Sequence, residues 1–170
     1  MIVIVFGLPG SGKSYFASAL SALIDAEYIN SDRVRNEMLE SKTYSLNERL
    51  SVYDEMLRQM KHFLKLKKNV LLDATFYKET IRDNFTKQPE CKDGILFIEV
   101  KADESVIRER LKNPRTHSDA DFKVYKIIKE QWEDLEKPHL ILQSANDNIV
   151  EMLDKTLDYL HLKDDKRTDK

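Results

Sequence analysis

Three of the four glycines in this 170-residue chain lie in one short segment, Gly7-Leu8-Pro9-Gly10-Ser11-Gly12-Lys13-Ser14. The segment fits the pattern G-x-x-x-x-G-K-[ST]. Glycines let successive backbone N–H groups converge on a phosphate, and a helix that opens near Lys13 adds its positive dipole end. Lys13 is expected to reach the β- and γ-phosphates, and the Ser14 hydroxyl to bind Mg²⁺. The segment therefore predicts a nucleotide-binding site made by residues 7–14. A plain strand–helix turn would need no lysine there.

A second polar cluster, residues 30–35, reads Asn-Ser-Asp-Arg-Val-Arg. Asp32 is a candidate general base close to a transferred phosphoryl group. The alternative is that Ser31 or Asp32 only caps the helix that follows. Cations in the first turn of a helix oppose its dipole, so Arg33 and Arg35 favour a polar or anionic ligand for one of them.

A third candidate is Asp73, which closes the apolar run Val70-Leu71-Leu72 and precedes Ala74-Thr75. An acidic residue at such a position resembles a Walker B aspartate, which holds Mg²⁺ directly or through water. A helix cap made by Asp73 or Thr75 is the alternative.

A fourth cluster runs from Arg108 to Asp121 and is interrupted at Pro114. Helix, short turn and helix are expected there, as in a lid that closes over a nucleotide. Arg110 and Arg115 would then stabilise charge on the transferring phosphoryl group. The alternative is an exposed charged helix face, on which Arg108 and Glu104 pair at i, i+4.

The elements that would position these residues alternate along the chain. Strands are expected at 2–6, 28–29, 69–73, 95–100 and 140–142, and helices near 15–24, 32–41, 46–67, 77–87, 103–112, 119–136 and 147–162. This alternation predicts an α/β fold with a parallel sheet covered by helices on both faces. In such sheets ligands bind beyond the carboxyl ends of the strands, where the polar clusters lie. We expect a single domain over 1–162 and a disordered polar tail at 163–170, which has no apolar residue.

The helix at 46–67 carries apolar residues at alternating spacings of four and three, which is a heptad stripe. The stripe comprises Leu46, Leu50, Tyr53, Leu57, Met60 and Leu64. Packing on its own domain is the favoured interpretation, and pairing of two subunits is the alternative. The chain is therefore expected to be a monomer or a dimer.

Composition excludes several classes of protein. The net charge of −2 gives no general attraction for a polynucleotide. No apolar run approaches the ~20 residues that a bilayer requires, so no membrane partner is expected. Cys91 is the single cysteine and cannot form an internal disulfide, and the N-terminus lacks the basic region of a signal peptide. A cytoplasmic location is expected.

With the clusters in this order, residues 1–145 resemble the P-loop kinases of the polynucleotide kinase and zeta-toxin-like group. The resemblance rests on the Gly7–Ser14 loop, Asn30-Ser31-Asp32 with Arg35, Asp73-Ala74-Thr75, and Glu109-Arg110-Leu111 with Arg115 and residues 118–121. It implies a five-stranded P-loop NTPase sheet of order 2-3-1-4-5 and a small helical lid. It also implies that Asp32 takes the proton of the acceptor hydroxyl, that Arg35 contacts the acceptor, and that Arg110 and Arg115 hold ATP phosphates. The chain departs from that group at Phe76, where polynucleotide kinases often have Asn.

These observations lead to one functional expectation and one alternative. The expectation is a phosphotransferase that moves the γ-phosphoryl of Mg-ATP to a hydroxyl of a small molecule or of a nucleic-acid 5′ end. The alternative is a regulatory ATPase or nucleotide switch without an acceptor. A GTPase is disfavoured because the chain lacks the Asp-x-x-Gly motif that GTPases have after the third strand. In addition, Lys101-Ala102-Asp103 matches part of the base-reading motif Asn-Lys-x-Asp, but Val100 replaces its Asn. Asp32 and Arg35 beside the phosphate site favour the phosphotransferase.

Overall fold

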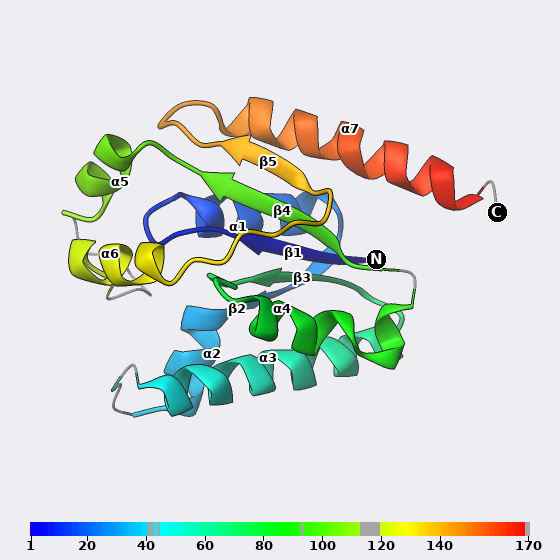
Figure 1. Ribbon diagram of the computed structural model, residues 1–170. Helices are drawn as coiled ribbons and strands as arrows, with labels where there is room; N and C mark the ends of the chain where they lie inside the picture. The colour runs from blue at the N-terminus through cyan, green and yellow to red at the C-terminus, as the bar shows by residue number, and fades with distance from the viewer. Residues whose placement is uncertain (41–42, 44, 93, 113–119, 169–170) are drawn as a thin grey trace.

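A five-stranded parallel sheet forms the centre of the computed structural model, which describes residues 1–40, 43, 45–92, 94–112 and 120–168. The strands are β1 (Ile2–Phe6), β2 (Ala26–Asn30), β3 (Asn69–Asp73), β4 (Leu96–Lys101) and β5 (Leu140–Gln143). They lie in the order β2-β3-β1-β4-β5, and each neighbouring pair is parallel. The predicted α/β fold and strand order are confirmed. In this order β1 is the central strand, so the loop that follows it lies at the middle of the row of strand carboxyl ends (Figure 1).

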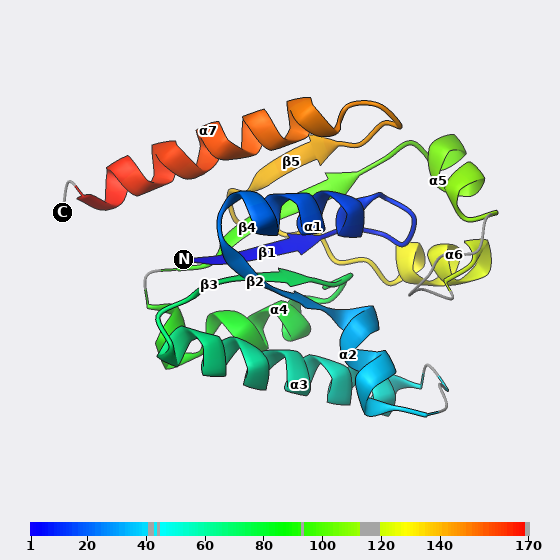
Figure 2. The ribbon, with the colours of Figure 1, turned by 180° about the vertical axis from the view of Figure 1, so that it is seen from behind.

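Helices cover both faces of the sheet (Figures 1 and 2). The helices are α1 (Lys13–Leu23), α2 (Ser31–Met38), α3 (Leu46–Lys65), α4 (Glu79–Thr86), α5 (Glu104–Arg110), α6 (Phe122–Glu130) and α7 (Ile149–Thr168), with a 3₁₀ turn at Pro89–Cys91. On one face, Phe16 of α1 and Met152 of α7 pack on Val3 and Val5 of β1. The alternate β1 residues turn to the other face, against α3 and α4. Burial on both faces explains why the strands are continuous apolar runs.

Helix α3 packs on its own domain, as the favoured interpretation of its stripe predicted. Its buried apolar residues are Val52, Met56 and Met60. Leu46 and Leu50, the first two members of the predicted stripe, are 60% and 40% exposed. The stripe was wrong at this end because the first turns of α3 extend past the sheet toward α2 (Figure 1).

The two largest differences between predicted and observed boundaries lie toward the C-terminus. The helix expected at 119–136 is α6, which ends at Glu130, and the chain then runs irregularly to β5. In that stretch Trp132 stacks on Phe6 of β1, with 6.0 Å between the ring centroids. This contact packs the irregular stretch against the sheet. The helix expected at 147–162 is α7, which continues to Thr168, and no Gly or Pro follows Leu162 to end it. The disordered tail at 163–170 stays a prediction.

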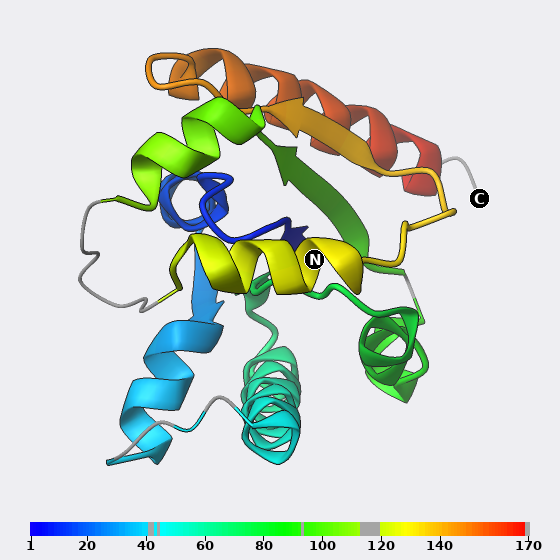
Figure 3. The same ribbon diagram turned by 60° about the vertical axis from the view of Figure 1, so that its left-hand side comes forward.

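Of the expected lid, the structure describes the two flanking helices, α5 and α6. Residues 113–119, including Arg115, lie outside the described residues. Helices α5 and α6 lie beside the loop that follows β1 (Figure 3). A Cβ on Gly10 of that loop would meet Ile107 of α5 and Leu111 just after it at 3.0 Å, so α5 packs closely on the loop.

Candidate active site

The loop between β1 and α1 has the conformation that its glycines permit. Gly12 caps α1 in the left-handed region, with φ of 92°. A Cβ on Gly7 would collide with the carbonyl oxygen of Val100 in β4. The loop is closed by the Ser11 N–H, which donates to the Leu8 carbonyl at 3.1 Å. The predicted phosphate-binding segment therefore forms one compact turn at the N-terminus of a helix.

A cavity of about 440 Å³ opens beside this loop. Lys13, Ser14 and Tyr15 line it from the first turn of α1, and Arg110 lines it from α5. The connection between β5 and α7 contributes residues 144–146 and 148. Tyr15 is 72% exposed. Sequence reasoning missed the β5–α7 connection. Its polar segment directly after the last strand was the available signal, because ligands bind beyond the carboxyl ends of parallel strands.

Arg110 lies across the rim of this cavity and joins two of its walls. Its Nη1 donates to the Ser11 carbonyl at 3.1 Å and to Ser144 Oγ at 3.2 Å. Its Nη2 donates to the Ala145 carbonyl at 2.8 Å, and its Nε to Asn146 Oδ1 at 3.2 Å. Burial lowers the pKa of Arg110. The guanidinium therefore links the loop after β1 to the loop after β5, beside residues 7–14, which sequence reasoning assigned to nucleotide phosphates.

Asp73 closes β3 next to the loop after β1, since it pairs in register with Val5. Its side chain is fully buried. Oδ2 accepts a hydrogen bond from Tyr28 Oη at 2.7 Å and another from Asn30 Nδ2 at 2.6 Å. Oδ1 has no hydrogen-bond partner among the described residues. A buried carboxylate oxygen without a partner is costly unless a ligand satisfies it, so Asp73 fits a cation. The alternative that Asp73 caps a helix is wrong, because α4 starts only at Glu79.

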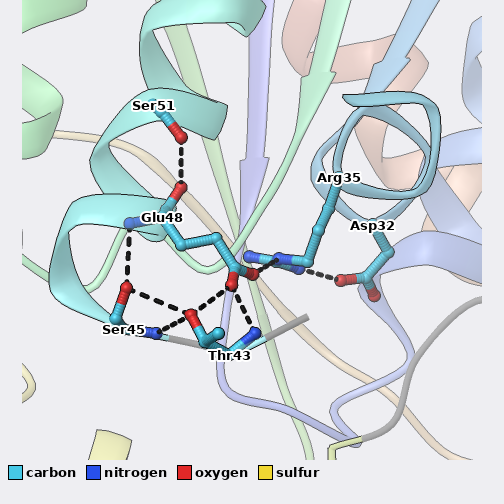
Figure 4. Close-up of polar contacts among 6 residues, drawn as sticks. All are labelled: Asp32, Arg35, Thr43, Ser45, Glu48 and Ser51. Carbon is cyan, nitrogen blue, oxygen red and sulfur yellow. Dashed lines mark hydrogen bonds and ion pairs between the residues drawn. The ribbon is translucent and has the colours of Figure 1, made fainter. Parts of the chain in front are cut away.

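Asp32 lies in the first turn of α2, and its Oδ1 accepts a hydrogen bond from Arg35 Nη1 at 2.8 Å (Figure 4). Arg35 Nε donates to Glu48 Oε1 at 3.1 Å. Glu48 of α3 also accepts from Thr43 N and Thr43 Oγ1, at 2.6 and 2.8 Å. One guanidinium thus bridges two carboxylates, of which that of Glu48 is buried and that of Asp32 is 28% exposed. Sequence reasoning missed Glu48, although Ser45-x-x-Glu48 is a capping-box pattern and Ser45 does cap α3.

The cap of α2 is Asn30, and neither Ser31 nor Asp32 makes it. Asn30 Oδ1 accepts from the N–H groups of Asp32 and Arg33 at 3.1 and 3.0 Å. The alternative interpretation of Asp32 as a helix cap is therefore wrong, and its carboxylate is left for other chemistry. Arg33 stacks on the ring of Tyr28, with 5.2 Å from the guanidinium carbon to the ring centroid.

The structure also places Arg108 and Phe76, which the sequence analysis had singled out. Arg108 pairs with Glu104 at 3.3 Å and lies over the ring of Phe122, as expected for the charged face of a helix. Phe76 is buried and has φ of +47°, a left-handed conformation that Asn adopts more easily than Phe. The departure from the polynucleotide kinase pattern at this position therefore carries backbone strain.

The fold and this site define the class of the protein. A glycine-rich loop joins the central strand to α1, an aspartate closes the adjacent strand β3, and the strands follow the order 2-3-1-4-5. This is a P-loop NTPase. Residues 2–138 match the family described as an AAA domain (AAA_33), and the chain belongs to this family.

Comparison with known proteins agrees with that assignment. A probable gluconokinase of Dictyostelium discoideum is 21% identical over 175 residues, which cover 94% of this chain and 86% of that protein. A sugar kinase from Janibacter sp. HTCC2649 superposes with a TM-score of 0.73 at 17% identity, covering 94% of this chain and 93% of that one. The APS kinase of Mycobacterium tuberculosis, solved with AMPPNP and APS, superposes with a TM-score of 0.68 at 16% identity, covering 94% and 97%. The fold is that of the P-loop kinases. The polynucleotide kinase subgroup stays a prediction.

No helix in the described part of the chain is both long and apolar enough to cross a membrane.

Proposed function

We propose that this protein is an ATP-dependent phosphotransferase that moves the γ-phosphoryl of Mg-ATP to a hydroxyl group of an acceptor. The observation that carries the proposal is Asp32. Its carboxylate is not used as a helix cap, it is partly exposed, and Arg35 holds it at 2.8 Å at the carboxyl end of β2. A nucleotide switch or a simple ATPase has no need of an oriented carboxylate at that place.

The nucleotide would lie in the cavity beside the loop after β1. Backbone N–H groups of residues 7–14 and the ammonium of Lys13 would bind the phosphate chain, as this loop type does. The exposed Tyr15 ring and the β5–α7 connection line the part of the cavity beyond the phosphates. Arg110 would hold the two walls together and add positive charge at the rim. Arg115 stays a predicted phosphate contact.

Ser14 and Asp73 are the residues that would hold Mg²⁺. The fit rests on the buried Asp73 Oδ1, which lacks a partner among the described residues, and on the place of Ser14 at the start of α1. Hydroxyl and carboxylate oxygens are ligands that Mg²⁺ accepts. When bound, the ion supplies neutralisation of charge on the β- and γ-phosphates.

Asp32 would act on the acceptor. An alcohol is a weak nucleophile at neutral pH, and a carboxylate within about 3 Å orients it and accepts its proton as the bond to phosphorus forms. Arg35 holds the carboxylate oxygen Oδ1, so the other oxygen, Oδ2, is the one proposed to receive the proton. Arg35 stays a candidate contact to the acceptor itself.

A small-molecule hydroxyl is the favoured acceptor class. The relatives and structural neighbours described above are named as kinases of gluconate, of a sugar and of APS. The net charge of −2 offers no general attraction for a nucleic-acid end.

The proposal is tested by a screen of ADP release from ATP over hydroxyl acceptors, with the phosphorylated product detected by mass spectrometry. The panel contains gluconate, hexoses, amino sugars, APS, nucleosides and 5′-hydroxyl oligonucleotides. We expect one acceptor to give ADP and phosphorylated product in equal amounts. ATP hydrolysis that is unchanged by every acceptor and by Asp32→Asn would overturn the proposal in favour of a regulatory ATPase.

A further inference from the structure

Asn30 uses both ends of its side-chain amide, and the two ends contact different halves of the site. Its oxygen caps α2, the helix that carries Asp32. Its nitrogen donates to Asp73 Oδ2 at 2.6 Å and lies 3.3 Å from Tyr28 Oη. Asn30 and Asp73 are also paired in register between β2 and β3, so their side chains lie on the same face of the sheet.

Capping alone does not explain these contacts. A cap needs only an oxygen, which Ser or Asp provides as well as Asn does. Asn adds an amide donor, and here that donor binds the carboxylate that we assign to the metal site. Asn30 is itself 7% exposed, so the contact with Asp73 is shielded from water.

Tyr28 is the second donor to the same oxygen of Asp73. Its hydroxyl donates to Asp73 Oδ2 at 2.7 Å. The same hydroxyl lies 3.4 Å from the carbonyl oxygen of Ser14. Tyr28 therefore also links Asp73 to the residue that would be its partner in binding Mg²⁺.

Two neutral donors on Oδ2 have a definite consequence for Oδ1. They hold the carboxylate in one rotation and leave its negative charge uncancelled, whereas a Lys or Arg at the same place would compete with a cation. Oδ1 is then the oxygen that stays available, and it has no partner among the described residues. Partners of this kind orient a metal ligand, and their removal typically costs about 10–100-fold in metal affinity or activity.

We propose that Asn30, with Tyr28, is a positioning residue that couples the helix of the acceptor base to the carboxylate of the metal site. The coupling runs through the side-chain amide of Asn30. A displacement of α2 would strain the hydrogen bonds to the amide oxygen, and a rotation of the Asp73 carboxylate would break the hydrogen bond from the amide nitrogen. This inference rests on the proposed function of the site.

The test uses variants that separate the two ends of the amide. Asn30→Ser keeps a capping oxygen and loses the donor to Asp73, and Asn30→Ala loses both. Tyr28→Phe removes the other donor and keeps the ring under Arg33. The matched control is Thr156→Val in α7, which also removes one buried hydroxyl hydrogen bond, of 2.8 Å, to the carbonyl of Met152.

The first measurement is the affinity for ATP by calorimetry, in EDTA and over a Mg²⁺ titration. We expect ATP affinity in EDTA to stay at the wild-type value in Asn30→Ser and Tyr28→Phe. The Mg²⁺ concentration for half-maximal enhancement of binding should rise about 10–100-fold in both, and stay unchanged in Thr156→Val. A general loss of structure would lower the affinity in EDTA as well. A wild-type Mg²⁺ dependence in both variants would overturn the inference.

The second measurement concerns coupling to the acceptor side. Asn30→Ala should lower kcat for transfer further than Asn30→Ser does, because only Asn30→Ala also releases the N-terminus of α2. Equal kcat values in the two variants would show that the cap does not position Asp32, and would overturn the coupling. Mg²⁺-dependent ATP binding needs no acceptor, so the first measurement stands even if the acceptor screen fails. A wild-type protein without Mg²⁺-dependent ATP binding would overturn both the proposed function and this inference.

Discussion

Replacement of Asp32 by Asn separates the chemistry of this residue from its contribution to the fold. Asn retains the size of Asp and an oxygen that can accept from Arg35 Nη1, but it cannot take a proton. Loss of a general base lowers transfer by about 10²–10⁴-fold. At about 1.36 kcal/mol per factor of ten, this corresponds to roughly 2.7–5.4 kcal/mol of transition-state stabilisation.

The cost to stability is expected to be much smaller. The α2 cap belongs to Asn30, so the substitution leaves it intact. The Asp32–Arg35 pair is 28% exposed on the carboxylate side, and such pairs contribute about 0–1 kcal/mol. Arg35 also keeps its contact with Glu48. A change in Tm of at most about 4 °C follows for a chain of this size.

Glu48→Gln is the matched comparison, because it alters the other carboxylate on the same guanidinium. Glu48 is buried and accepts from three donors of Arg35 and Thr43. A Gln amide presents N–H groups to at least one of these donors, and a buried donor without an acceptor costs about 1–3 kcal/mol. Glu48→Gln should therefore lower Tm more than Asp32→Asn does and lower transfer less.

The assay combines calorimetric ATP affinity, phosphoryl transfer to the acceptor found in the screen, and thermal unfolding on both variants. We expect Asp32→Asn to bind ATP as the wild type does and to lose transfer. Full transfer by Asp32→Asn would refute the assignment of Asp32 as the base. A drop in Tm that accounts for the lost activity would refute it equally.

Three other predictions follow from the site. Lys13→Ala should lower turnover at least ~10²-fold, on the scale of other electrostatic catalytic groups, and unchanged ATP turnover in the folded variant would contradict the role of Lys13. Arg110→Lys keeps the charge but loses the planar fork that joins Ser11 and Ala145, so calorimetry should show weaker ATP binding; wild-type affinity would make Arg110 dispensable for the cavity. Phe76→Asn relieves left-handed strain of about 1–2 kcal/mol. It also removes a buried ring whose loss costs about 3–5 kcal/mol, so urea unfolding should show a net loss of about 1–4 kcal/mol, and a more stable variant would show that the strain outweighs the packing.

The sequence alone determined the parts of the protein that depend on local spacing. The Gly7–Ser14 segment and the apolar strand before it predict the phosphate-binding turn, because its conformation comes from glycines that are adjacent in the chain. The strands at 2–6 and 69–73 coincide with β1 and β3, since both are short apolar runs buried on two faces. Asp73 follows from its place at the end of such a run.

Only the tertiary structure decided which of the short polar residues at the end of β2 caps α2 and which one contacts Arg35. Asn30, Ser31 and Asp32 are all good helix caps, so local propensity does not choose among them. The pairing of β2 with β3 places Asn30 against Asp73, and that contact makes Asn30 the cap and leaves Asp32 to Arg35. Glu48 joins this cluster from α3, and its capping-box pattern gave no indication of Arg35.

The walls of the nucleotide cavity were likewise decided by contacts between distant segments. Arg110 and Ala145 are 35 residues apart in the chain, yet one guanidinium joins the loop after β1 to the loop after β5. Sequence periodicity reports which face of an element is apolar, and it carries no information on which loops meet at a sheet edge. The strand order brings these loops together, because parallel strands 1, 4 and 5 are neighbours and all end at the same edge.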